Sequence, residues 1–159
     1  MIKPIITQLE EKKLVGQYVT MSLAKNRTGA LWSGFMPRRN EIENRVGVNF
    51  FSMQVFPTDY HLKFNPERLF QKWATVEVTN FESIPEDMEV FILKTGLYAV
   101  FDYKGSSTDP TIFQYIYNEW LPNSEYELDD RPHFEVLGTK YRNNDPNSEE
   151  EIWIPIKQA

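Results

Sequence analysis

The sequence contains no cysteine. This absence excludes disulfide frameworks, thiol nucleophiles and thiolate-bound metals together. Glycine is also scarce, with seven residues scattered along the chain, and no phosphate-binding glycine loop or dinucleotide fingerprint is present. No stretch approaches the roughly twenty apolar residues of a membrane-spanning helix. The start, MIKPIITQLEEKK, has too short an apolar run for a signal peptide. We therefore expect a soluble, cytoplasmic protein without a membrane partner.

Basic residues are outnumbered by acidic ones. The chain has 17 Lys and Arg against 23 Asp and Glu, giving a net charge of −6 and a pI of about 5.0. Nucleic-acid binding normally requires a basic stripe, whereas the only basic cluster here is Arg38 and Arg39, which we interpret as a solvated helix end. We therefore expect no direct contact with nucleic acid. The negative field weakly favours cationic ligands.

The chain also contains few histidines. His61 and His133 are the only two, and neither belongs to a metal-ligand motif. No nucleophile elbow of the Gly-x-Ser-x-Gly type is present either. The sequence therefore indicates no metal and no cofactor.

Aromatic and apolar residues are abundant. The 159 residues are 41% hydrophobic and 14% aromatic, with eleven Phe, eight Tyr and four Trp. This length and composition are typical of one folded domain. Large rings usually fill a core, but a surplus also suits a concave ligand site, and both interpretations stay open at this point.

Strand patterns dominate the chain, with two helices among them. The clearest helix is STDPTIFQYIYNEWLPNS, which Thr108 or Asp109 can cap, Pro110 can start and Pro122 helps to end. An earlier, weaker helix is RTGALWSGFMPRRNEIEN. Alternating or β-branched runs predict strands in KKLVGQYVTMSL, VNFFSMQVF, WATVEVTNF, MEVFIL, LYAVFDY, HFEVLGTKY and EEIWIPI.

The order of these elements repeats. Residues 31, 32, 35, 36 and 37 match residues 116, 117, 120, 121 and 122 in class, each 85 positions further on. Strand, helix and a pair of strands follow one another twice, with FESIPEDME as the connection. We predict an α+β fold of duplicated βαββ modules, at about 1–80 and 86–159. An approximate twofold axis would relate them, with helices packed on an antiparallel sheet and a ligand groove where the halves meet. The segment PTDYHLKFNPERLFQK interrupts the first module.

Several segments resemble a known family. GLYAVFDYKG, IYNEWLPNSEYELDDRPHFEVLG and SEEEIWIPI, with WATVEV upstream, resemble the GyrI-like effector-binding family. This module stands at the C-terminus of AraC- and MerR-type regulators and also occurs alone, in DNA gyrase inhibitory proteins and integron-associated drug-binding proteins. The resemblance covers essentially the whole chain and is strongest in residues 96–156. It implies a duplicated βαββ fold whose central groove binds hydrophobic, often cationic compounds. Because the module begins almost at Met1, we expect no DNA-binding domain.

A carboxylate in mid-strand marks the candidate site. In HFEVLG, Glu135 stands between Phe134 and Val136, and burying a carboxylate costs several kcal/mol unless something compensates. If this strand pairs with EIWIPI, the isoleucine face can join the Phe134 and Val136 face. Glu135 and Trp153 would then share the opposite side, towards the groove. The alternative is that Glu135 is solvated and Trp153 covers an edge. The resemblance implies that both positions line the ligand groove.

Five further residues are weaker candidates for the same site. They are Trp32 and Phe35 on the first helix, Phe51 and Glu77 on strands of the first half, and Trp120 on the second helix. Core packing or a solvated face explains each of them as well, and Trp120 suits a helix-to-sheet anchor. The run Glu149, Glu150 and Glu151 is interpreted as a solvated strand entrance without a role.

The function that follows is a binding module for small hydrophobic or cationic compounds, acting as a sensor, a sequestering protein or an effector partner. Aromatic walls supply cation–π attraction and a half-dry carboxylate supplies charge complementarity. One alternative is a hydrolase of electrophilic small molecules, in which Glu135 acts as a general acid or base. Another is a protein-interaction role of the gyrase-inhibitor kind, with a regulator or gyrase as the partner.

Overall fold

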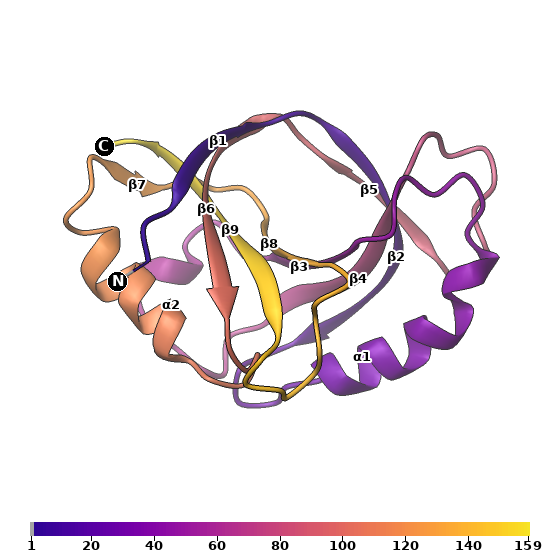
Figure 1. The fold of residues 1–159 in the computed structure, drawn as a ribbon, viewed down its shortest axis with the longest axis horizontal. Coiled ribbons are helices and arrows are strands. Elements are labelled where there is room, and N and C mark those ends of the chain that lie inside the picture. Colours follow the sequence, from indigo (N-terminus) through magenta and orange to yellow (C-terminus); the bar gives the residue numbers. More distant parts are fainter. Residues whose placement is uncertain (1) are drawn as a thin grey trace.

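The computed structural model describes residues 2–159 as an α+β protein, in which two helices pack on a curled antiparallel sheet (Figure 1). The sheet order is β1-β6-β9-β8-β3-β4-β2-β5, and β7 pairs with β9. The strands are β1 (Ile5–Leu9), β2 (Lys12–Met21), β3 (Phe50–Val55), β4 (Phe70–Val78), β5 (Glu89–Leu93), β6 (Gly96–Lys104), β7 (Tyr126–Leu128), β8 (His133–Leu137) and β9 (Glu149–Gln158). Seven of these are the predicted strands; β1 and β7 were not predicted.

The sheet forms a ring because β1 continues into β2 and β5 continues into β6, and these two long stretches pair with each other. The chain passes from β1 almost directly into β2, and from β5 into β6. β1 pairs with β6 and β2 pairs with β5 in one common register, in which Ile5 lies opposite Val100 and Gly16 lies opposite Glu89. Figure 1 shows the resulting arc of β1 and β2 closing over β3 and β8.

The strand pairing repeats in the two halves of the chain. β2 pairs with β4 and β4 with β3 in the first half, just as β6 pairs with β9 and β9 with β8 in the second. The halves meet where β3 pairs with β8, and Ser52 lies opposite Glu135 at the centre of that ladder. The predicted fold class, a duplicated βαββ arrangement with pseudo-twofold symmetry, is confirmed.

The helices lie at opposite ends of the ring, on its outside (Figure 1). α1 (Thr28–Phe35) continues as the 3-10 helix η1 (Met36–Glu41) and buries Leu31 and Phe35. α2 (Thr111–Tyr115) continues as the π-helix η3 (Ile116–Trp120) and buries Ile112 and Ile116. Both helices coincide with the predicted segments. A third short helix, η2 (Tyr60–Leu62), lies in the segment that interrupts the first half.

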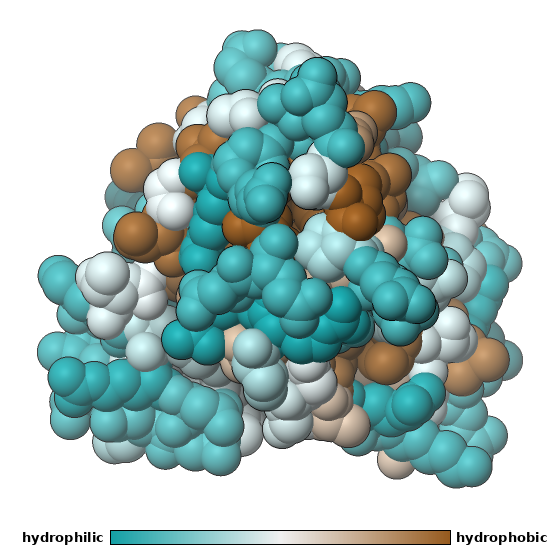
Figure 2. Space-filling view, turned by 90° about the vertical axis from the view of Figure 1, so that its right-hand side faces the viewer, coloured by the Kyte–Doolittle hydropathy of each residue, from teal (hydrophilic) through white to brown (hydrophobic). Residues whose placement is uncertain are grey.

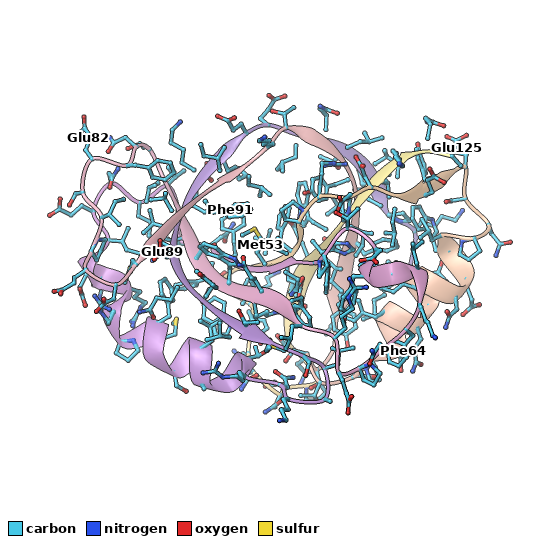
Figure 3. The ribbon with its side chains drawn as sticks, turned by 180° about the vertical axis from the view of Figure 1, so that it is seen from behind. Met53, Phe64, Glu82, Glu89, Phe91 and Glu125 are labelled. Atoms are coloured by element: carbon cyan, nitrogen blue, oxygen red, sulfur yellow. The ribbon has the colours of Figure 1, made fainter. Side chains whose placement is uncertain are left out.

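The sheet separates two apolar layers, which we call the inner and the outer face. The inner face is the inside of the ring, where Met53 and Phe91 are visible in Figure 3, and its side chains are largely aromatic. The outer face carries the helices. Its two main clusters join α1 to strands of the first half and α2 to Ile152, Ile154 and Ile156 of β9. No helix within residues 2–159 is long and apolar enough to cross a membrane.

Gly16 shows how closely the strands of the ring approach one another. A Cβ atom added at this position would overlap the main chain of Ala74 and Thr75 on β4. Both contacts are with backbone, which cannot move aside as a side chain could. A glycine is therefore required where β2 runs between β4 and β5.

Candidate functional site

Glu135 lies at the centre of the outer face, between the two helices. Across β8 and β9 it is opposite Ile152, whose side chain belongs to the cluster under α2. Across β3 it is opposite Ser52. Polar residues occupy the neighbouring row, where Gln54 lies opposite both Lys72 of β4 and His133 of β8. Polar side chains therefore lie on the ladder between β3 and β8, where the two halves of the duplicated fold meet.

The Glu135 carboxylate has few partners for a group that is only 15% exposed. Gln54 Nε2 donates a hydrogen bond to Oε1 at 3.4 Å, and Lys72 Nζ is 3.9 Å from the same oxygen. Burial raises the pKa of Glu135 above its ordinary value, although Lys72 and Gln54 act in the opposite direction. Lys72 is itself buried, so this ion pair is held away from water.

A second carboxylate shares this environment. Burial raises the pKa of Glu150 to about 7, and the charge of Glu135 adds to the increase while Lys72 opposes it. The charge of Lys72 therefore acts on both acids, and its ion pair is with Glu135. We call Glu135, Glu150, Lys72 and Gln54 the carboxylate cluster. With both acids ionised the cluster carries one excess negative charge, in a place where water screens it poorly.

A pocket with a cavity volume of about 510 Å³ includes Glu150 in its lining. Of the carboxylate cluster only Glu150 lies in its wall, and Val136 in the same wall belongs to the core of the inner face. Its lining comes from the ends of β6, β8 and β9 and from the loop before β3, and consists of Val48, Asn49, Asp102, Tyr103, Lys104, Val136, Gly138, Thr139, Lys140, Glu149, Glu150 and Glu151.

Aromatic rings cover the other side of the cluster. Tyr117 of η3 and His133 are joined by a hydrogen bond between Tyr117 Oη and His133 Nδ1 at 3.2 Å. The connection between β3 and β4 places His61 against His133, with ring centroids 5.0 Å apart, and Phe56 edge-on to it at 4.9 Å. Burial lowers the pKa of His133 to about 3, so the ring is neutral and does not compensate the carboxylates. The segment that interrupts the first half thus forms part of the site's cover.

Trp153 lies on the inner face, and the prediction that it shares a side with Glu135 is wrong. The register decides this, because Trp153 is opposite Phe134 rather than Glu135. The two rings stack with centroids 5.0 Å apart, and Tyr98 packs against Trp153 at 5.7 Å. Since successive side chains on a strand point to opposite faces, Glu135 is left with the isoleucines. The tryptophan faces the aromatic interior of the ring.

The other predicted site residues are divided between the faces. Phe51 belongs to the inner core, and Glu77, opposite the inner-core residue Leu14, pairs with Lys12 at 3.3 Å. Trp32 and Phe35 pack with each other and with Phe50 on the outer face. Trp120 packs edge-on to Phe101 at 5.2 Å, the helix-to-sheet anchor named as its alternative. Their prediction as one site is wrong, since the sheet separates Phe51, Glu77 and Trp153 from Glu135.

Sequence reasoning missed most of the partners of Glu135. Lys72 was available as a signal, because a lysine inside the apolar strand FQKWATVEV is as unusual as the glutamate in HFEVLG. Glu150 was set aside within an acidic run, and only the fold shows that it lies near Glu135. Residues 2–159 contain no group of His, Cys, Asp and Glu side chains that could hold a metal ion.

The order of the strands and the two helices on the outer face define the class of this protein, the GyrI-like α+β domains. More particularly, residues 5–156 match the sequence model of the family "integron-associated effector binding protein". The chain belongs to this family.

Comparisons with individual proteins agree with this assignment. The chain is 31% identical over 151 residues to the transcriptional regulator BrlR of Pseudomonas aeruginosa, covering 90% of this chain and 51% of BrlR, so it spans about half of that relative. Its fold resembles an integron cassette protein from Vibrio cholerae, with a TM-score of 0.68, 15% identity and coverage of 98% and 96%. It also resembles SAV2435 bound to tetraphenylphosphonium, with a TM-score of 0.67, 18% identity and coverage of 98% and 94%.

Proposed function

We propose that this protein binds a small apolar cation at the carboxylate cluster and acts as an effector-binding module. The observation that carries the proposal is the imbalance of charge on the outer face, where Lys72 forms an ion pair with Glu135 and its single charge also acts on Glu150. A bound cation would compensate the excess negative charge, and the low local dielectric would make that attraction stronger than in water.

The surroundings favour a cation with apolar surface over a hydrated metal ion. Tyr117, His133 and Phe56 provide rings beside the cluster, and Tyr103 lines the pocket that reaches Glu150. Rings attract organic cations by about 0.5 to 2 kcal/mol and add apolar contact area. Tetraphenylphosphonium, which SAV2435 binds, has both a delocalised charge and apolar rings and is therefore a suitable probe.

The same site would serve a sensor, a sequestering protein or the ligand-binding half of a regulator. Ligand binding couples to a partner only if the partner favours one state of the domain. The structural relation to regulator domains supports such a partner, and a chain that acts alone would bind the cation without further consequence.

Titration calorimetry with tetraphenylphosphonium tests the site. We expect Glu135→Gln to weaken binding by about tenfold or more, which corresponds to about 1.4 kcal/mol. Glu77→Gln is the matched control, because Glu77 is also a partly buried strand glutamate paired with a lysine, but on the inner face. Unchanged binding in Glu135→Gln, or an equal loss in both variants, would show that the cation does not bind at the carboxylate cluster.

A second candidate function is hydrolysis of an electrophilic small molecule. It is favoured by one observation, the pKa of about 7 at Glu150 in the wall of a pocket, since a general acid or base works best when its pKa is near the working pH. Turnover of electrophilic esters or epoxides that Glu150→Gln abolishes would support this function. Stoichiometric binding without turnover across such a panel would leave the binding module as the function.

A further inference from the structure

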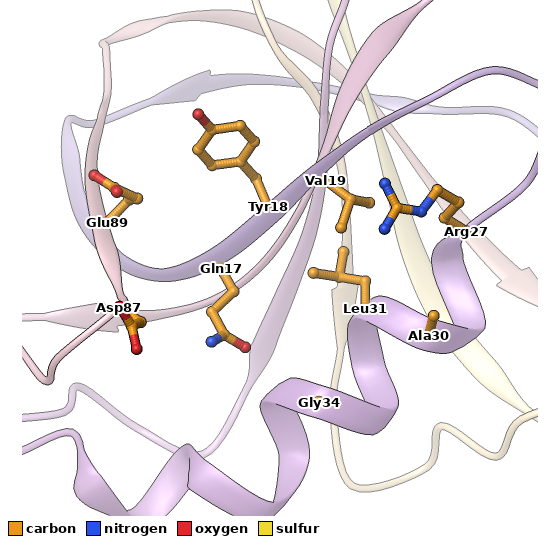
Figure 4. A pocket seen from close by; sticks show the side chains of 9 residues that line it. All are labelled: Gln17, Tyr18, Val19, Arg27, Ala30, Leu31, Gly34, Asp87 and Glu89. Carbon is orange, nitrogen blue, oxygen red and sulfur yellow. The ribbon is translucent and has the colours of Figure 1, made fainter.

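A second pocket lies away from the carboxylate cluster, between α1 and the edge of β2. Its cavity volume is about 430 Å³. It is on the side of the molecule that Figure 2 presents, where hydrophilic residues surround smaller apolar areas. Figure 4 shows the lining residues from β2, from α1 and from the start of β5: Gln17, Tyr18, Val19, Arg27, Ala30, Leu31, Gly34, Asp87 and Glu89. We call it the α1 pocket.

The pocket exists because α1 presents small side chains on this side. A Cβ atom added at Gly34 would meet nothing within 4 Å, so the space beside the helix is open. A glycine inside a helix costs about 0.5 to 1 kcal/mol relative to alanine, and no tight contact explains it here. In the second helix the positions 85 residues further on from Ala30 and Gly34 carry Tyr115 and Glu119. The second helix therefore carries large side chains at the positions where α1 carries Ala30 and Gly34.

The edge of β2 in this pocket has no strand beside it. Pairing between β5 and β2 ends at Glu89 and Gly16, whereas β2 continues to Met21. Arg27 Nη1 donates to the main-chain oxygen of Thr20 at 3.5 Å from this free side. Main-chain groups of alternate residues in a strand point to the same side, so the N–H and C=O of Tyr18 also point towards the pocket. An extended chain could pair with them as an added strand.

Opposite charges lie at the two ends of the pocket. Arg27 is at one end, next to Thr20, while Asp87 and Glu89 are at the other, as Figure 4 shows. Within residues 2–159 the carboxylates of Asp87 and Glu89 accept no hydrogen bond and form no ion pair, although the charge of Arg38 acts on Asp87. The guanidinium group of Arg27 donates only to Thr20. Asp87 has a φ of +64°, in the left-handed region that few residues other than glycine adopt. The turn before β5 therefore holds Asp87 in one defined backbone conformation.

We propose that the α1 pocket binds a short zwitterionic peptide of about three residues. Its ammonium group would lie between Asp87 and Glu89, its carboxylate on Arg27, and its main chain along β2. From Gly16 to Thr20 the strand rises by about 13 Å. An extended tripeptide spans about 10 Å, which leaves room for the charged side chains that reach in from both ends. This site is separate from the carboxylate cluster and does not rest on the function proposed there.

Trialanine and its end-blocked forms test the proposal on the whole protein. We expect trialanine to shift the amide resonances of Tyr18 and Gly34 in a nitrogen–proton correlation spectrum. N-acetylation and C-terminal amidation should each weaken binding by about tenfold, because each removes one charge. Arg27→Gln should remove the advantage of the free carboxylate, and Glu89→Gln that of the free ammonium group.

A matched pair of helix variants separates occupancy of the pocket from general effects. Gly34→Leu should fill the pocket and abolish binding. Gly29→Leu is its control, since Gly29 also has open space around it but does not line the pocket. No shift up to about 10 mM trialanine, equal affinity for free and end-blocked peptides, or unchanged binding in Gly34→Leu would each overturn the proposal. Tetraphenylphosphonium binding should be unaffected by Gly34→Leu, so the two sites are tested independently.

Discussion

Replacing Glu150 by glutamine should stabilise the protein above about pH 4.5, and by the full amount only above about pH 7. Glu150 has a folded-state pKa of about 7 against an ordinary value of 4.5. The folded state therefore binds the proton more tightly than the unfolded chain does. Ionisation of Glu150 destabilises the folded state progressively as the pH rises from 4.5, and the effect is complete above about pH 7.

The magnitude follows from the two pKa values. Each tenfold change in proton affinity corresponds to 1.36 kcal/mol, so the full difference is about 3 kcal/mol. Glu150 is only half-buried and lines an open pocket, so solvent screening lowers the expected gain to about 1 to 3 kcal/mol. For a domain of this size that raises Tm by a few degrees, at roughly 2 to 4 °C per kcal/mol.

Urea unfolding of wild type and Glu150→Gln across a pH series measures this gain. The two free energies of unfolding should coincide near pH 4 and separate as the pH rises to about 8. Glu149→Gln is the matched control, because it makes the same change at the neighbouring exposed residue. A constant difference between wild type and Glu150→Gln at all pH values, or the same pH-dependent gain in Glu149→Gln, would refute the reasoning.

Three more predictions concern the two faces of the sheet. Tetraphenylphosphonium should bind more tightly at about pH 8 than at about pH 6, because Glu150 ionises in this interval; calorimetry giving equal affinities would contradict this. Trp153→Ala should cost about 3 kcal/mol of stability by removing a ring that stacks in the inner core. Trp153→Phe should keep the affinity for the cation, and a loss of affinity in this variant would show that Trp153 belongs to the site. Gly16→Ala should destabilise by about 2 kcal/mol or more, as measured by urea unfolding, because the added Cβ meets the main chain of β4.

Much of the fold is present in local patterns. Alternating apolar residues predicted seven strands, and the spacing of Ile112, Ile116 and their neighbours predicted the second helix, because side-chain period and secondary structure are directly linked. The repeated order of elements indicated the duplication. β1 was missed because Ile5 and Ile6 lie in a short run interrupted by polar residues, and β7 is only three residues long.

What the sequence by itself determined is that Glu135 is an anomalous carboxylate in a strand next to an isoleucine-rich partner strand. Only the tertiary structure decided which residues surround Glu135. A shift of one residue in the pairing of β8 with β9 exchanges the faces of every side chain, and no local pattern states which register forms. The observed register places Trp153 with Phe134 inside the ring and brings Glu135 to Lys72 and Glu150, from strands far apart in the chain.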